Sequence, residues 1–137
     1  MIRSLHHATA TVSGAQADLD FYVGLLGLRL VKKTVNFDNH HVFHFYYGDE
    51  RGTPGTIMTT FPYADMGVRV GRKGSGQITA TGFSVPAGSL GVWRARLAEH
   101  RVAVTGEGTR FGGPFLGFDD PSSLAIELIE SGAGAPD

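Results

Sequence analysis

Two adjacent histidines near the start of the chain are the first residues whose chemistry could matter. His6 and His7 lie in SLHHATATV (residues 4–12), where polar and apolar side chains alternate in a way that predicts a β-strand. Neighbouring side chains on a strand point to opposite faces, so the two rings cannot both reach one site. His7 shares its face with Thr9 and is either a metal ligand or a hydrogen-bonded histidine in a polar groove. His6 shares the alanine face, which belongs under a covering helix, so it either leans toward that helix or lies near the beginning of the strand.

A carboxylate near the other end of the chain is the second candidate. In DDPSSLAIELIE (residues 119–130), residues 120–123 are typical of a turn, and the alternation that follows predicts a strand. Glu127 lies on the face opposite Ile126 and Leu128, among apolar neighbours. We interpret it as a functional carboxylate; the alternative is a charge that protects an edge strand from aggregation.

His44 is the third candidate. In the predicted strand 42–47 it shares a face with Tyr46. It suits an acid–base or substrate-orienting role, and the alternative is a buried histidine that bonds to a neighbouring backbone group. The other histidines are expected in an exposed turn or at a helix end, where they need no such role: His40, His41 and His100.

The composition limits what these residues can serve. The chain has 137 residues and no cysteine, which excludes disulfides and thiolate ligands and fits a reducing compartment such as the cytoplasm. Twelve basic and thirteen acidic residues, with no basic run, give no electrostatic footprint for nucleic acid or an anionic membrane. No apolar run is long enough for a membrane span. We therefore expect a small-molecule partner.

The elements that must position these residues follow an order that occurs twice. A strand, a helix with Ser13 as its N-cap and three more strands are predicted at 3–12, 15–26, 28–37, 42–47 and 56–61. The same order follows a connector at 63–76, with elements at 77–85, 87–102, 101–105, 114–118 and 125–130. The predicted fold is α+β: two βαβββ units (about 1–62 and 77–131) that form a curled mixed sheet in a single domain, 1–137.

Alignment of the two units shows where they differ. When Val12 is matched with Val85, strand falls on strand and helix on helix, and the counterpart of His7 is Ala80. The repeat is therefore one of pattern, and a second histidine is missing at the matching position.

The two end motifs together resemble those of the vicinal oxygen chelate superfamily, which includes glyoxalases, bleomycin-resistance proteins and extradiol dioxygenases. HFYYGDERGTPGTIMTTFP, GRKGSGQ and GTRFG are more closely similar to the N-terminal half of hydroquinone-type ring-cleaving dioxygenases. The resemblance spans nearly the whole chain.

This resemblance implies a divalent metal, Fe(II) or Mn(II), held by two histidines and a carboxylate, with an aromatic diol and O2 as reactants. It assigns metal ligation to His7 and Glu127 and a pocket-lining role to Thr9. His6 would then either move a proton from the bound diol or hold His7 in place, and His44 would act as an acid–base or substrate-orienting group. A homodimer is expected, because exchange of units could bring His7 of one subunit to Glu127 of the other.

Two alternatives remain open at this stage. Ala80 supports a metal-free binding protein or a structural half-domain of a larger dioxygenase. A glyoxalase-like isomerase is the other, but it would usually need two glutamates where only Glu127 is well placed.

Overall fold

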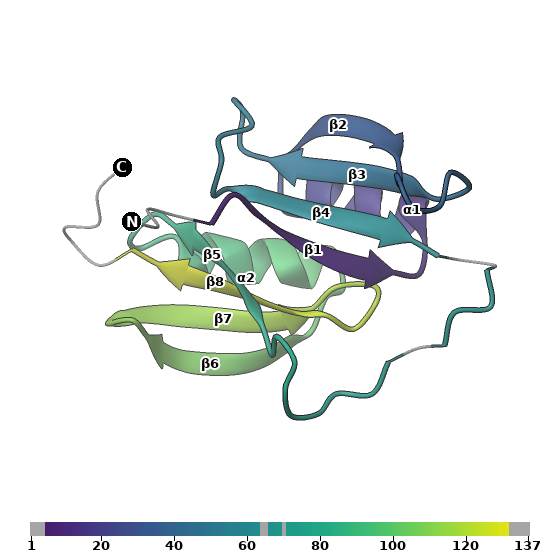
Figure 1. Cartoon of the computed structure of the whole chain (residues 1–137). Coiled ribbons are helices and arrows are strands. Elements are labelled where there is room, and N and C mark those ends of the chain that lie inside the picture. The colour runs from purple at the N-terminus through teal and green to yellow at the C-terminus, as the bar shows by residue number, and fades with distance from the viewer. Residues whose placement is uncertain (1–4, 64–65, 70, 132–137) are drawn as a thin grey trace. The chain divides into compact units, whose positions relative to one another are not determined.

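The computed structural model describes residues 5–63, 66–69 and 71–131, and the chain divides into two compact units, Met1–Arg72 and Lys73–Asp137. Each unit contains one helical segment and four strands (Figure 1). The predicted α+β fold with a repeated βαβββ order is therefore confirmed. Each unit carries its own four-stranded mixed sheet.

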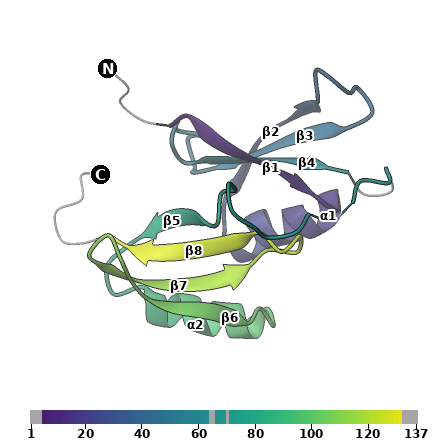
Figure 2. The ribbon, with the colours of Figure 1, turned by 60° about the horizontal axis from the view of Figure 1, so that its bottom comes forward.

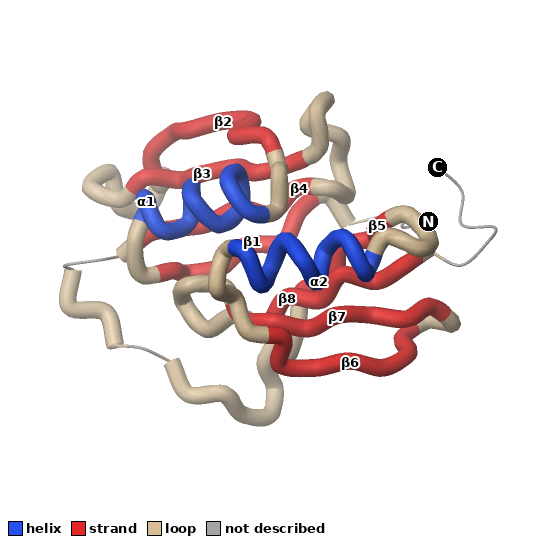
Figure 3. Tube along the Cα trace, turned by 180° about the vertical axis from the view of Figure 1, so that it is seen from behind, coloured by secondary structure: helices blue, strands red, loops and turns tan. Residues whose placement is uncertain are grey.

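The sheet of unit 1 has the strand order β1-β4-β3-β2. β1 runs parallel to β4, whereas β3 is antiparallel to both of its neighbours. The helical segment follows β1 and lies across one face of the sheet (Figure 3). The elements of unit 1 are β1 (His7–Val12), α1 (Ala15–Asp18), η1 (Leu19–Leu25), β2 (Arg29–Val35), β3 (Phe43–Gly48) and β4 (Ile57–Pro62).

Unit 2 repeats this arrangement with the order β5-β8-β7-β6, and again the outer pair, β5 and β8, is parallel. In Figure 2 the four strands lie side by side in this order, and α2 lies behind the sheet. The elements of unit 2 are β5 (Thr81–Val85), α2 (Leu90–Glu99), β6 (Val104–Arg110), β7 (Gly113–Asp119) and β8 (Ala125–Glu130).

The first helix differs from the prediction. One turn of α-helix, α1, gives way to the π-helix η1, in which the Leu26 N–H donates to the Phe21 carbonyl five residues back. The wider turn buries Phe21 and Tyr22 and leaves Val23 exposed, so the apolar stripe expected from ordinary helical spacing is shifted. The N-cap is Gly14 and makes no side-chain bond, so the prediction of Ser13 as the cap is wrong.

The core of unit 1 lies between this helical segment and the sheet. The rings of Tyr22 and Tyr47 stack with centroids 5.0 Å apart, and both side chains are fully buried. Burial raises the pKa of Tyr47 to about 12, the nearby hydroxyl of Thr60 opposes this, and the charge of Asp18 adds to it. A polar cluster of three buried side chains is thus part of an aromatic core.

The core of unit 2 is built against α2. Four of its apolar side chains are almost fully buried, one on the helix and three on the sheet: Leu97, Leu116, Phe118 and Ile126. Glu130, at the end of β8, accepts a hydrogen bond of 2.9 Å from the Leu90 N–H. The cap of α2 therefore comes from a carboxylate forty residues further along the chain.

Other boundaries move by a few residues. Arg101 adopts a left-handed φ of 58° directly after α2, and β6 begins only at Val104, so the strand predicted at 101–105 starts too early. The predicted start of the first strand, at residue 3, lies outside the described residues. No helix among the described residues is long and apolar enough to cross a membrane.

Candidate functional site

The histidine pair lies at the beginning of β1. His6 precedes the strand, and its backbone carbonyl accepts a 2.7 Å hydrogen bond from the N–H of Gly55, a residue with a left-handed φ of 98°. The Nδ1 atoms of His6 and His7 are 3.0 Å apart, and their rings meet edge to face. One ring therefore donates and the other accepts, which fixes the orientation of His7.

His7 also begins a row of polar side chains on the strand face opposite the helical segment, which we call the polar face. On β1, the side chains on this face are exposed, whereas Val12 on the other face is buried. Strand register places Thr9 beside Thr59, Thr59 beside Tyr46 and Tyr46 beside Lys32. The polar face comprises His7, Thr9, Lys32, His44, Tyr46, Thr59 and Phe61.

Hydroxyl groups at the centre of the polar face are already connected. Thr59 Oγ1 donates a 2.8 Å hydrogen bond to Thr9 Oγ1, and so links the parallel strands β4 and β1. Thr59 is fully buried, whereas Thr9 is exposed. Thr9 therefore has hydrogen-bonding capacity left on the exposed side of the sheet.

His44 is the most buried ring of the polar face, with 8% of its surface exposed. It stacks on Phe61 at a centroid distance of 4.0 Å, and its Nδ1 lies 3.0 Å from the hydroxyl of Tyr46. Burial lowers the pKa of His44, and the positive charges of His7 and Lys32 lower it further. The ring is thus neutral at pH 7, so one of its nitrogens carries a proton and the other is an acceptor.

The charge of this face has one sign. The four strands of unit 1 contain no aspartate or glutamate, while the ammonium group of Lys32 lies 5.5 Å from the centre of the Tyr46 ring. An electron-rich or anionic ligand would meet no repelling carboxylate from these strands.

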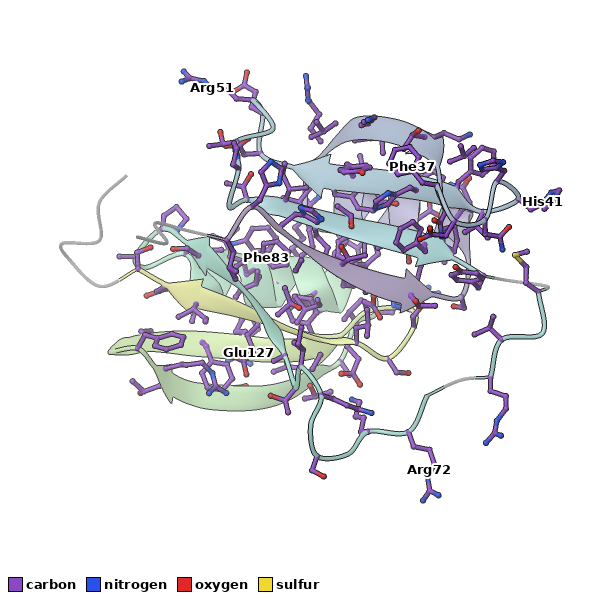
Figure 4. The ribbon with its side chains drawn as sticks, viewed as in Figure 1. Phe37, His41, Arg51, Arg72, Phe83 and Glu127 are labelled. Carbon is purple, nitrogen blue, oxygen red and sulfur yellow. The ribbon has the colours of Figure 1, made fainter. Side chains whose placement is uncertain are left out.

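Glu127 lies in unit 2, on β8, and is 8% exposed. Figure 4 shows it among the strands of that unit's sheet. Arg110 binds both carboxylate oxygens, from Nη2 to Oε1 at 2.7 Å and from Nε to Oε2 at 2.5 Å. The guanidinium also lies over the Phe115 ring. The carboxylate is therefore engaged by a two-pronged ion pair.

The register shows how the two units differ at equivalent positions. Thr59 pairs with Thr9 three residues before the end of β1, and Glu127 pairs with Gly82 three residues before the end of β5. Thr59 is thus the counterpart of Glu127, just as Ala80 is the counterpart of His7. Unit 1 has the histidine without the carboxylate, and unit 2 has the carboxylate without the histidine.

The separation of the histidine and the carboxylate into different units limits how these residues could hold a metal ion. His7 is exposed on the polar face and can offer a ring nitrogen, whereas Glu127 could coordinate only after release from Arg110. No group of three histidines or carboxylates within the described residues is arranged to hold a metal ion. His6, His7, Thr9 and His44 are brought together in unit 1, and Glu127 belongs to the other unit.

Three neighbours of these residues were not predicted: Tyr46, Lys32 and Arg110. Period-two alternation already placed Tyr46 on the same face as His44. The contacts of Lys32 and Arg110 depend on which residues of adjacent strands lie opposite one another, and both β2 and β6 contain a register shift.

Two βαβββ units, each with a parallel outer pair of strands, define a glyoxalase-like fold. Residues 4–128 match the Glyoxalase/Bleomycin resistance protein/Dioxygenase superfamily, and the chain belongs to this family.

Individual relatives are closer still. The chain is 47% identical over 130 residues to "Putative ring-cleaving dioxygenase MhqO" of Bacillus subtilis (strain 168), which covers 95% of this chain and 41% of the relative. It is 41% identical over 131 residues to chlorohydroquinone/hydroquinone 1,2-dioxygenase of Sphingobium indicum, covering 94% of this chain and 40% of the relative. The chain thus spans about two-fifths of the length of these relatives.

The crystal structure of a "putative dioxygenase from Bacillus subtilis subsp. subtilis str. 168" superposes on this chain with a TM-score of 0.87. The two sequences are 47% identical, and the match covers 93% of this chain and 40% of the other. The resemblance to ring-cleaving dioxygenases and the fold expected from it are confirmed.

Proposed function

We propose that this chain supplies the substrate face and a metal ligand of a ring-cleaving dioxygenase, which opens an aromatic diol of the hydroquinone type with O2. The observation that carries the proposal is the identity of 41% with chlorohydroquinone/hydroquinone 1,2-dioxygenase over 94% of this chain. The polar face of unit 1 supports it, because it presents imidazole, hydroxyl and ammonium groups without a carboxylate from its strands.

The residues have separate tasks in this proposal. A divalent ion, Fe(II) or Mn(II), would lower the pKa of the diol and bring it to O2. His7 would hold that ion through a ring nitrogen, while His6 keeps the His7 ring oriented. Thr9 would line the substrate pocket, and His44 would serve the polar face as an acid–base or substrate-orienting group. Glu127 would complete the ligand set if its carboxylate leaves Arg110.

We also propose that both units act as one domain, 1–137, and that the chain works as a homodimer. The support is that neither unit by itself carries both the histidine and the carboxylate at the equivalent positions. A ligand set shared between subunits would combine His7 of one with Glu127 of the other.

Metal binding and ring cleavage are tested on the same variants. The purified chain is dialysed against Fe(II) under nitrogen and its retained iron is measured; oxygen uptake with hydroquinone is then followed. We expect His7→Ala to lose both iron and oxygen uptake. His41→Ala is the matched control, because His41 lies in the exposed loop before β3 and points away from the sheet (Figure 4). Equal loss in both variants would contradict the role of His7.

A metal-free binding protein or structural half-domain is the second candidate. The incomplete ligand set of each unit favours it. It would be preferred if the wild-type chain retains no iron, manganese, nickel or zinc and its melting temperature does not change on addition of Fe(II). Isomerisation of a glyoxal thiohemiacetal without oxygen uptake would instead indicate the glyoxalase-like alternative.

A further inference from the structure

The hydrogen bonds of His44 are incomplete. Its Nε2 is buried and finds no hydrogen-bond partner among the described residues, while Nδ1 lies 3.0 Å from Tyr46 Oη. A neutral imidazole can protonate either nitrogen. Protonation at Nε2 would leave a buried N–H without an acceptor, which is rarer and costlier in proteins than an unused acceptor. The surroundings therefore favour the proton on Nδ1.

This tautomer determines what the tyrosine can do. With Nδ1 protonated, His44 donates to Tyr46 Oη, and the hydroxyl proton of Tyr46 is left for another acceptor. Tyr46 is half-buried, whereas His44 is 8% exposed, so the tyrosine is the outer member of the pair. Packing holds the pair in place, because His44 lies between the rings of Tyr46 and Phe61, at 4.2 and 4.0 Å.

The neighbours of Tyr46 suggest the kind of acceptor it meets. Its ring centroid is 6.4 Å from that of His7, and Lys32 Nζ lies 5.5 Å from its ring. Lys32 is positively charged, His7 offers a ring nitrogen, and the strands of this sheet contribute no carboxylate. A phenolic or phenolate oxygen near His7 would satisfy this environment.

We propose that Tyr46 binds the aromatic substrate by donating its hydroxyl to a ring oxygen, and that His44 is the positioning residue that holds this hydroxyl in place. The inference rests on the proposed function and names a substrate contact within it. Of the two roles predicted for His44, it favours the orienting one: His44 would act through Tyr46 instead of exchanging protons with the diol.

The test uses paired deletions. Tyr46→Phe removes the donor and keeps the ring. His44→Phe removes Nδ1 and keeps an aromatic ring against Phe61, whereas His44→Asn places an amide nitrogen near the position of Nδ1. Hydroquinone binding to the Fe(II)-supplied chain is measured by calorimetry under nitrogen, and KM and kcat are measured in air.

We expect Tyr46→Phe to raise Kd and KM about tenfold while kcat changes less, as for loss of one ground-state hydrogen bond. His44→Phe should weaken binding in the same way, His44→Asn should restore it, and the double variant Tyr46→Phe/His44→Phe should bind no more weakly than Tyr46→Phe. Tyr63→Phe is the control: it deletes a tyrosine hydroxyl that accepts a bond from Asn36, and Tyr63 is not one of the residues of the polar face.

The outcomes separate the inference from the proposed function. Binding that depends on Tyr46 without oxygen uptake would support the substrate contact and contradict the dioxygenase. Oxygen uptake with unchanged Kd and KM in Tyr46→Phe would support the dioxygenase and overturn the contact. Additive losses in the double variant would overturn the positioning role of His44, and a chain that neither binds nor oxidises hydroquinone would overturn both proposals.

Discussion

Glu127 is a carboxylate whose behaviour depends on its partner. Arg110 binds both of its oxygens, yet the arginine side chain is 46% exposed and the glutamate side chain 11%. The glutamate is thus nearly enclosed by the sheet, while the group that neutralises it reaches in from solvent. Removal of the arginine leaves the enclosed member without compensation, whereas removal of the glutamate leaves an arginine that water can solvate.

We therefore predict that Arg110→Gln lowers the free energy of unfolding by about 1–3 kcal/mol, the cost of a partly buried group that loses its charged partner. Denaturation by urea at pH 7 measures it. Arg94→Gln is the control, since the Arg94–Glu107 pair has both side chains about half exposed; it should change stability little. If the two variants behave alike, enclosure of Glu127 does not matter to stability.

Tyr47 gives a prediction for alkaline pH. Its pKa is raised to about 12 in the folded chain, against 10.0 for an ordinary tyrosine. Between these values the unfolded chain loses the proton and the folded chain keeps it, so stability falls as pH rises. The loss attributable to this residue reaches about 2 to 3 kcal/mol by pH 12.

Urea denaturation at intervals from pH 9 to 12 measures this slope. Tyr47→Phe should remove that part of the decline, although it begins from a different stability at pH 9. Tyr63→Phe should keep the wild-type slope. A decline of unchanged steepness in Tyr47→Phe would mean that other groups account for it.

Among the elements, α2 shows how a helix can depend on a distant strand. The carboxylate of Glu130 accepts hydrogen bonds from backbone N–H groups at the start of the helix, and these bonds lower its pKa. A negative charge at this end also complements the helix dipole. The same hydrogen bonds therefore attach the helix to β8 and stabilise the first turn of the helix.

We predict that Glu130→Gln lowers the melting temperature at pH 7 and has a smaller effect at pH 3. A carboxylate with a depressed pKa stabilises the folded chain above its unfolded pKa, and this stabilisation is lost as pH falls through the folded value. Differential scanning calorimetry at both pH values measures it. Glu99→Gln, at the opposite end of α2, should not lower the melting temperature, because a negative charge there opposes the dipole. A loss as large at pH 3 as at pH 7 would mean that the charge of Glu130 does not contribute.

Most elements could be predicted because strands with one buried face alternate with period two. The same rule placed His7 and Thr9 together, and also His44 and Tyr46. The π-helix could not be predicted, since nothing in AQADLDFYVGLL marks the change from four-residue to five-residue hydrogen bonds; burial of Tyr22 against Tyr47 settles it. The partner of Glu127 was also out of reach, because Arg110 approaches it from a strand two positions away in the sheet.

For the whole molecule, the division of histidine and carboxylate between units allows a complementation test of the proposed homodimer. His7→Ala and Glu127→Ala chains are each expected to be inactive. If subunits share sites, refolding an equal mixture should restore about a quarter of the wild-type oxygen uptake, because only mixed dimers contain an intact pair.

Light scattering on the same samples gives the oligomeric state. Activity that stays absent in mixtures proven to contain mixed dimers would contradict shared sites, and a strict monomer would remove the dimer altogether. A mixture of His7→Ala with His41→Ala serves as the control, since one partner then keeps both proposed ligands.

The hydrogen bond between Thr9 and Thr59 has a further consequence for how the molecule forms. It joins residues fifty positions apart, and within the sheet of unit 1 β1 pairs with β4, the last strand of that unit to be made. During synthesis β1 stays unpaired until β4 has been made. Contacts so distant in sequence also form slowly. The histidine pair is therefore attached to a sheet only when the unit is complete, so a nascent or truncated unit 1 would carry the histidines without the face on which they are proposed to act.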